Sequence, residues 1–209
     1  MLEIIKPMDI EKRSFEIISG ILAEQGITLD PLNEPVIKRV IHTTADFDYV
    51  KNLVFSENAV LKAREALLAG CDIVTDTQMA RSGVNKTILA RLGGEVHCFM
   101  ADEDVAAEAK ARGVTRAFVS MEKASRLEKP VMFAIGNAPT ALIAIDELIK
   151  AGRLSPKLII GVPVGFVNVV ESKELIIASD APHIVARGRK GGSNVAAAIV
   201  NALLYQIAR

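Results

Sequence analysis

The hydrophobic positions of this chain form two kinds of segment that alternate along most of its length. Short, nearly continuous apolar runs are typical of strands buried on both faces, and they occupy Asp72–Thr75, Glu95–Met100, Val131–Ile135, Leu158–Val162 and Ile184–Arg187. Around these runs, apolar residues recur at helical spacing, which predicts amphipathic helices. These helices are expected at Ile10–Gln25, Glu34–Ala45, Glu57–Ala69, Glu103–Ala111, Thr115–Leu127, Thr140–Ala151, Asn168–Ile177 and Ser193–Ile207.

Strands that alternate with helices predict one fold class. A strand–helix–strand connection is almost always right-handed, and it places parallel strands side by side with helices on both faces. We therefore expect an α/β fold of three layers, α/β/α, around a central, mostly parallel sheet of about five strands. The sequence contains no internal repeat, low-complexity tract or linker, so residues 1–209 are expected to form a single domain.

Composition and charge narrow the class of protein. Half of the 209 residues are hydrophobic, and 25 Lys and Arg residues balance 25 Asp and Glu residues. Without a basic excess, and with two Tyr and no Trp, the chain is not expected to bind nucleic acid. No apolar run approaches the ~20 residues that cross a bilayer, and the first residues lack a signal-peptide core. We expect a cytoplasmic protein without a membrane partner, in which Cys71 and Cys98 are buried, reduced thiols.

The loops that follow the strands are the expected place for a ligand, since open parallel sheets bind ligands beyond the carboxyl ends of their strands. Two of these loops, Gly136–Thr140 and Arg187–Asn194, are rich in Gly and small polar residues. The second combines cations with a helix start, where unpaired N–H groups attract anions. It matches no phosphate loop, and a tight turn with solvated charges is the alternative. As an anion site it suits carboxylates, and Asn137, Gly191 and Ser193 are candidate binding residues.

His42 is the candidate for proton transfer. On a helix over Glu34–Ala45 the apolar residues form one stripe, whereas Arg39 and His42 lie on the opposite side, three residues apart. Histidine is the side chain best suited to exchanging a proton near neutral pH. An ordinary surface histidine is the alternative. His97, within a strand, is expected to be a packed core residue, and His183, at the mouth of a strand, is expected to be structural.

Further arginines extend the list of candidate contacts. Arg81 lies shortly after a strand end, and Arg116 begins a later helix. Each alone is typical of a surface charge, but together they suit a molecule with many acid groups. The three histidines and two cysteines show no metal-ligand spacing, so no metal site is expected. No cofactor is expected either.

Six strings of residues carry a resemblance to a known family. They are Arg13–Phe15, Arg39–His42, Ile135–Leu142, Gly161–Val167, Glu171–Lys173 and Arg187–Ser193. The chain resembles the precorrin-8X methylmutases of cobalamin biosynthesis, in which similar strings occur in the same order. The I-G-N-A-P-T-A-L, G-V-P-V-G-F-V and R-G-R-K-G-G-S strings are specific when they occur together, and the resemblance covers nearly the whole chain.

The resemblance implies an isomerase that moves a methyl group within ring C of a corrin precursor, from an α-carbon to the adjacent β-carbon. It also implies a homodimer with its site near the subunit interface. By the same resemblance, His42 would be catalytic, and Ser14, Arg39 and Arg116 would contact a tetrapyrrole that carries acetate and propionate arms. The stretch Thr43–Tyr49 looks more like the cobalt-dependent branch, which would make the substrate cobalt-precorrin-8.

Two other functions remain open at this point. An S-adenosylmethionine-dependent methyltransferase would also suit an α/β sheet, although Thr75–Gln78 is not the glycine-rich loop expected after its first strand. A non-catalytic carrier that binds a corrinoid and passes it on would share the binding residues, and turnover would distinguish it from an enzyme.

Overall fold

Parallel strands form the centre of the fold in the computed structural model, which describes residues 6 and 9–208. The sheet has six strands in the order β1-β6-β5-β4-β2-β3. These strands are β1 Leu53–Phe55, β2 Asp72–Thr75, β3 Val96–His97, β4 Val131–Ile135, β5 Leu158–Gly161 and β6 His183–Ala186. All neighbours pair in parallel except β1, which runs antiparallel to β6. The predicted α/β fold is confirmed, with one strand more than the five or so expected.

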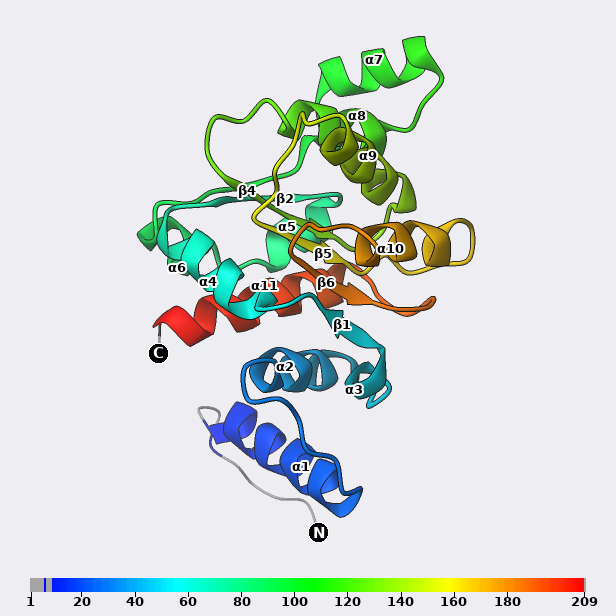
Figure 1. The fold of residues 1–209 in the computed structure, drawn as a ribbon. Helices are drawn as coiled ribbons and strands as arrows, with labels where there is room; N and C mark the ends of the chain where they lie inside the picture. The colour runs from blue at the N-terminus through cyan, green and yellow to red at the C-terminus, as the bar shows by residue number, and fades with distance from the viewer. Residues whose placement is uncertain (1–5, 7–8, 209) are drawn as a thin grey trace.

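Helices cover both faces of this sheet (Figure 1). One face carries α8 (Arg116–Ala124), α9 (Pro139–Lys150) and α10 (Val169–Ile177), and α7 (Glu103–Arg112) packs on α8. The other face carries α2 (Glu34–Thr44), α4 (Ala59–Leu68) and α11 (Ser193–Ala208), with α1 (Ile10–Glu24) outside α2. The remaining helices are short: α3 (Tyr49–Asn52), α5 (Gln78–Gly83), α6 (Lys86–Arg91) and a 3-10 turn at Phe99–Ala101.

Each face of the sheet has its own hydrophobic core, because successive strand residues point to opposite faces. In β4, Met132 and Ala134 pack with the helices α2, α4 and α11, whereas Phe133 and Ile135 pack with α8, α9 and α10. All four side chains are fully buried. This two-sided burial is the reason that the central strands are continuous apolar runs in the sequence instead of alternating ones.

Strand β1 was not predicted, because three residues are too short to show an alternating pattern and its conformation depends on pairing with β6. The register places Leu53 opposite Ala186, the last residue of β6. Because the pair is antiparallel, the start of β1 lies at the carboxyl edge of the parallel strands. Helix α2 precedes β1 by only a few residues, so its C-terminal end lies at that edge as well.

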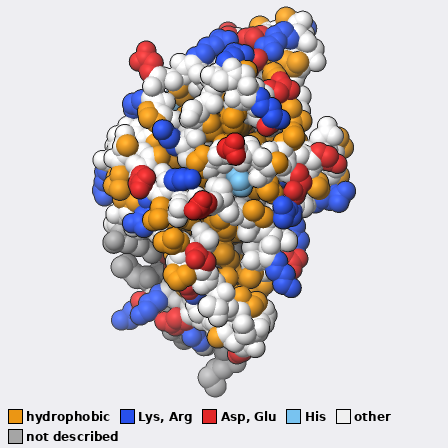
Figure 2. All heavy atoms as spheres, in the orientation of Figure 1, with side chains coloured by type: hydrophobic (Ala, Val, Ile, Leu, Met, Phe, Trp, Pro, Cys, Tyr) orange, Lys and Arg blue, Asp and Glu red, His pale blue; other side chains and the backbone are white. Residues whose placement is uncertain are grey.

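On the surface drawn in Figure 2, acidic, basic and hydrophobic side chains are mixed. This distribution agrees with the equal numbers of acidic and basic residues in the sequence. Within the part of the chain that the structure describes, no helix is both long and apolar enough to span a membrane. Cys71 and Cys98 are unpaired and buried, as expected.

Candidate active site

The loops that follow β2, β4, β5 and β6 meet at one edge of the sheet, because parallel strands with helical crossovers all end there. The helices α5, α9, α10 and α11 begin at this edge, and their first turns leave backbone groups that need partners. We call this edge the carboxyl edge. It brings together residues that are more than a hundred positions apart in the sequence.

A buried carboxylate organises the loop after β4. Asp76 is 1% exposed, and its two oxygens accept hydrogen bonds from the backbone N–H groups of Gly136 at 2.9 Å, Asn137 at 2.8 Å and Ala138 at 2.6 Å. Burial raises the pKa of Asp76, and the three N–H groups oppose that rise. These bonds fix the backbone of Asn137 at the carboxyl edge, where its side chain is exposed.

Ser193, the first residue of α11, is held at the carboxyl edge by hydrogen bonds. The hydroxyl oxygens of Ser193 and Thr77 lie 2.7 Å apart, and the N–H of Gly192 donates to the carbonyl of Val162 at 2.8 Å. Gly136 permits this approach, since a Cβ atom there would lie only 2.7 Å from the Cα of Ser193. The structure therefore brings the candidate residue Ser193 against the loop that carries Asn137.

The loop between β6 and α11 lies over a buried lysine. Lys173 is fully buried in α10, and its Nζ donates to the carbonyls of Gly188 at 2.7 Å and Lys190 at 2.8 Å. Burial lowers the pKa of Lys173 to about 8. The candidate Gly191 packs so closely on β5 that a Cβ atom would lie 2.0 Å from the carbonyl oxygen of Val162. Only glycine fits this contact.

His42 lies in the last turn of α2, the turn nearest the carboxyl edge. Its side chain is exposed, and the imidazole stacks on the ring of Phe15 with centroids 5.3 Å apart and planes at 30°. The opposite side of the helix is buried, as the spacing predicted, at Val36, Ile37, Val40 and Ile41. His42 therefore presents its ring at the surface, with one face resting on α1.

Two aspartates connect the end of α2 to the loop before α11. The Nζ of Lys190 lies 2.6 Å from a carboxylate oxygen of Asp46 and 2.6 Å from one of Asp48. The hydrogen bond from Lys190 lowers the pKa of Asp46. These groups are near the surface, so the ion pairs contribute little stability. They do place the end of α2, and so the turn that carries His42, beside the loop that carries Gly191.

Arg39 is less exposed than its position opposite the apolar stripe predicted. Its side chain is 12% exposed, and both terminal nitrogens lie 3.0 Å from the carboxylate of Glu11. The guanidinium carbon lies 4.8 Å from the ring centroid of Phe15 and 5.1 Å from that of Tyr205. The helices α1 and α11 thus cover this side of α2.

Ser14, next to Phe15, donates its hydroxyl to the carbonyl of Ile10 at 2.9 Å.

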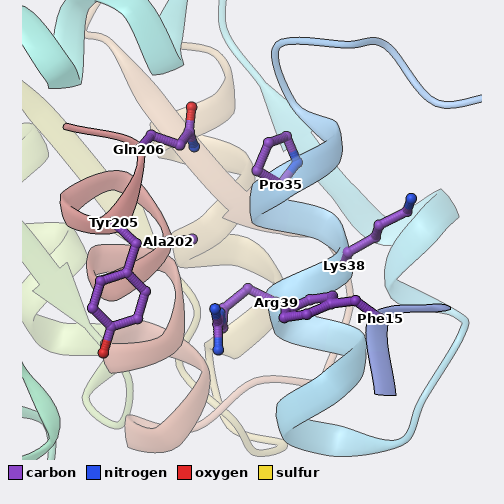
Figure 3. A pocket seen from close by; sticks show the side chains of 7 residues that line it. All are labelled: Phe15, Pro35, Lys38, Arg39, Ala202, Tyr205 and Gln206. Atoms are coloured by element: carbon purple, nitrogen blue, oxygen red, sulfur yellow. The ribbon is translucent and has the colours of Figure 1, made fainter. Parts of the chain in front are cut away.

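A cavity of about 280 Å³ lies beside Arg39. Figure 3 shows Arg39 reaching from α2 towards Tyr205 on α11, with the ring of Phe15 beside it. The lining residues are Phe15, Pro35, Lys38, Arg39, Ala202, Tyr205 and Gln206. Ligand pockets usually hold about 300–1,000 Å³, so this cavity is small for a large ligand. None of Asn137, Gly191 and Ser193 lines it.

The two remaining arginines lie in different places. Arg81 is exposed on α5, and its Nε donates to the carbonyl of Val96 at 3.2 Å. Val96 belongs to β3, at the opposite edge of the sheet from β1, so the structure does not bring Arg81 near α2. Arg116 is the exposed first residue of α8. The preceding residue, Thr115, lies with its hydroxyl 2.8 Å from that of Thr140, in the segment after β4, which places Arg116 near the carboxyl edge.

The other histidines lie away from α2. The side chain of His97 is 23% exposed, and its Nε2 lies 3.1 Å from the carboxylate of Asp72. The expectation of a packed core residue is therefore wrong, because β3 is an edge strand with one open side. His183 is buried, with its Nδ1 2.9 Å from the carbonyl oxygen of Ala181. Among the described residues, no group of three or more His, Cys, Asp or Glu side chains lies close enough to hold a metal ion.

Asp76 and Lys173 are the residues that our sequence analysis did not select. Both left a signal in the sequence, since each places a charge where the pattern predicts burial. Asp76 directly follows the apolar strand β2, and Lys173 falls at helical spacing between the buried residues Val169 and Ile176. A charge on a buried stripe indicates a group with internal hydrogen-bond partners.

Comparisons with known proteins identify the family of this chain. The model of the precorrin-8X methylmutase family matches residues 9–206. A Salmonella typhimurium protein named cobalt-precorrin-8 methylmutase is 48% identical over 206 residues, covering 97% of this chain and 96% of the relative. The precorrin-8X methylmutase of Pseudomonas aeruginosa is 40% identical, covering 93% of each chain. The solved precorrin-8X methylmutase of Thermus thermophilus has a TM-score of 0.85 and 38% identity, covering 96% of this chain and 98% of that one. The chain belongs to the precorrin-8X methylmutase family.

Proposed function

We propose that this chain is an isomerase of cobalamin biosynthesis that converts cobalt-precorrin-8 by moving a methyl group within ring C. The observation that carries the proposal is the 48% identity, over 97% of the chain, to a relative named cobalt-precorrin-8 methylmutase. The exposed imidazole of His42, beside an edge rich in cations and backbone N–H groups, supports it. A methyltransferase or a non-catalytic carrier is not favoured, because the relatives carry the methylmutase name.

The substrate's acid arms fit the carboxyl edge better than the cavity beside Arg39. The exposed cations Arg189 and Lys190 flank the loop before α11, and Arg116 lies near the segment after β4. A corrin precursor is a broad macrocycle with several carboxylates, which suits an open surface lined by spaced cations. We infer that the ring system lies over this edge, within reach of His42, and that Asn137, Gly191 and Ser193 contact its arms.

The reaction needs no atom from outside the substrate. The bond from the methyl group to the α-carbon breaks and the bond to the adjacent β-carbon forms, so the oxidation level does not change. The role of His42 is to donate a proton, or a hydrogen bond, to the macrocycle near ring C. This withdraws π-electron density from the ring and favours the migration. When the shift is complete the proton returns to the imidazole, and His42 is ready for the next turnover.

Arg39 and Ser14 act from the side of α1. The ring of Phe15 touches both the guanidinium of Arg39 and the imidazole of His42, so Arg39 steadies the surface on which the histidine rests. A direct contact between Arg39 and a substrate carboxylate requires exchange with the carboxylate of Glu11, which occupies both of its terminal nitrogens. Arg81 lies at the far edge of the sheet, and we retain it only as a contact for a peripheral arm.

We also propose that residues 1–209 form one domain and that the protein is a homodimer with its site near the interface. The single sheet and the family match over residues 9–206 support one domain. Exposed apolar side chains at the carboxyl edge support an interface there, since such groups are usually covered. Phe166 is 81% exposed and Val167 is 79% exposed, both in the loop between β5 and α10.

Turnover of the two substrate forms tests the proposed activity. Incubation with cobalt-precorrin-8 should change the visible spectrum, because the methyl shift alters the conjugation of the macrocycle. Cobalt-free precorrin-8X should react more slowly. The absence of a spectral change with either compound would show that the proposed reaction is wrong.

The variant His42→Ala should lose turnover by about 10²–10⁴-fold, the usual contribution of a positioned acid or base. Binding of the product should persist, because the variant leaves the proposed binding residues of the carboxyl edge unchanged. His97→Gln is the matched control, since it removes an imidazole at the other edge of the sheet. Initial rates and product titration by absorbance measure both effects. Normal turnover by His42→Ala would exclude the catalytic role.

The variant Arg116→Ala should raise KM about tenfold with little change in kcat, because a charge-assisted hydrogen bond to a substrate carboxylate contributes on the order of 1.5–3 kcal/mol. Arg126→Ala is the control, as it removes an exposed arginine two residues beyond the C-terminal end of the same helix. Steady-state kinetics with cobalt-precorrin-8 gives both constants. An equal KM for the two variants would remove Arg116 from the binding residues.

Light scattering during size-exclusion chromatography tests the homodimer. The measured mass should be twice that of the chain at micromolar concentration, because covering the exposed apolar loop stabilises the pair. Phe166→Asp should shift the mass towards that of one chain. A wild-type protein that elutes with the mass of a single chain, and turns over at the full rate, would contradict the proposal.

A further inference from the structure

Lys173 is a buried cation that the reaction proposed above does not use. Its side chain is fully buried, and among residues 9–208 its ammonium group bonds to two carbonyl oxygens and forms no ion pair with a carboxylate. Removing an ammonium ion from water is costly unless polar groups replace its hydration shell. The two carbonyls, of Gly188 and Lys190, are therefore the partners that keep this charge in place.

Three consecutive carbonyls of the loop before α11 accept hydrogen bonds from other parts of the protein. Those of Gly188 and Lys190 accept from Lys173 at 2.7 and 2.8 Å, and that of Arg189, between them, accepts from the N–H of Gly165 at 3.2 Å. Lys173 provides two of the three bonds, and the loop after β5 provides the third. The orientation of this stretch of backbone thus depends mainly on one side chain.

The N–H groups of the same peptides face the other way. In a trans peptide the N–H points opposite to the carbonyl of the preceding residue, and no cis peptide occurs in the described chain. The N–H groups of Arg189, Lys190 and Gly191 therefore point away from the groups that bind the carbonyls. None of the three donates a hydrogen bond to a residue that the structure describes. Arg189 and Lys190 are exposed and Gly191 is partly exposed, so this part of the loop lies at the surface.

We propose that Lys173 is a positioning residue that holds the loop between β6 and α11 with three successive N–H groups turned towards a carboxylate arm of the substrate. This inference rests on the proposed function and adds to it the group that shapes the anion site. Donors fixed in advance bind an anion better than mobile ones, because their ordering cost is met when the protein folds. The ammonium behind the loop adds positive potential, which buried surroundings screen weakly.

The surrounding charges are consistent with this role. On the solvent side of the loop, the ammonium of Lys190 is held by Asp46 and Asp48, and Arg187 is paired with Glu174 at 2.9 Å. Arg189 has no ion pair with a described residue, and its guanidinium carbon lies 5.8 Å from the ring centroid of Phe166. The two aspartates exceed Lys190 by one negative charge, and Arg189 balances that charge. Lys173, behind the loop, therefore gives these surroundings a net positive charge.

The variant Lys173→Met tests the proposal, since methionine preserves most of the volume and removes the donors and the charge. With cobalt-precorrin-8, KM should rise at least about tenfold while kcat stays within about twofold of wild type, because His42 lies on a different element. The melting temperature should also fall, because the carbonyls of Gly188 and Lys190 lose the donor that satisfies them. Lys62→Met, at an exposed position on α4, is the control.

If Lys173→Met has the same KM as the wild type, the proposal is wrong. That holds even if the melting temperature falls, because a purely structural residue would lower the melting temperature without changing KM. Amide hydrogen exchange on the wild-type protein gives a test that does not depend on the folding of the variant. The amides of Arg189, Lys190 and Gly191 should exchange rapidly in the protein alone and slow down when cobyrinate, the product expected from cobalt-precorrin-8, is added. If a saturating concentration of product does not slow the exchange of these amides, the proposal is also wrong. Failure of the proposed function is a different result, because the wild-type protein would then show no turnover.

Discussion

Backbone groups at the carboxyl ends of the parallel strands must find hydrogen-bond partners, and this requirement shapes the site. Asp76 satisfies three N–H groups in the loop after β4, and Lys173 satisfies two carbonyls in the loop after β6. Both ions are buried, where an unmet hydrogen bond would be most costly. Each loop is thereby held in one conformation, and the backbone surface above it is set by a buried ion.

The two ions have opposite effects on the polarity of the edge. A carboxylate below one loop draws N–H groups inward, whereas an ammonium below the other draws carbonyls inward and leaves N–H groups outward. The glycines complete the arrangement by allowing close backbone contact, at Gly136 against α11 and at Gly191 against β5. A side chain at either position would separate loops that the hydrogen bonds require to be in contact.

Much of this fold could be predicted from the sequence, and the physical reason is burial. The strands β2, β4, β5 and β6 are buried on both faces, so their apolar runs are continuous and easily recognised. The buried stripe of α2 was predicted from its spacing in the same way. Strand β1 and the helices α3, α5 and α6 are too short to show a period, and only their tertiary contacts determine them.

Only part of the candidate site could be predicted from the sequence, because many of its contacts join residues that are far apart in the chain. The exposure of His42 follows from a count along one helix, and the loop before α11 shows its cations and glycines directly. The low exposure of Arg39 could not be predicted, because the rings that pack on it come from two other helices, Phe15 on α1 and Tyr205 on α11. The partners of Asp76 and Lys173 lie far along the chain, so the sequence reveals an unusual buried charge but not what it holds.

The pairing of β1 with β6 has a consequence for biosynthesis of the protein itself. Among the described residues, the first strand of the sheet in sequence order pairs only with the last strand, and Asp46, just after α2, contacts Lys190, which is 144 positions later in the chain. The turn that carries His42 is therefore synthesised well before the loop that it contacts. A nascent or truncated chain that ends before residue 190 lacks the lysine that holds this turn beside the loop before α11.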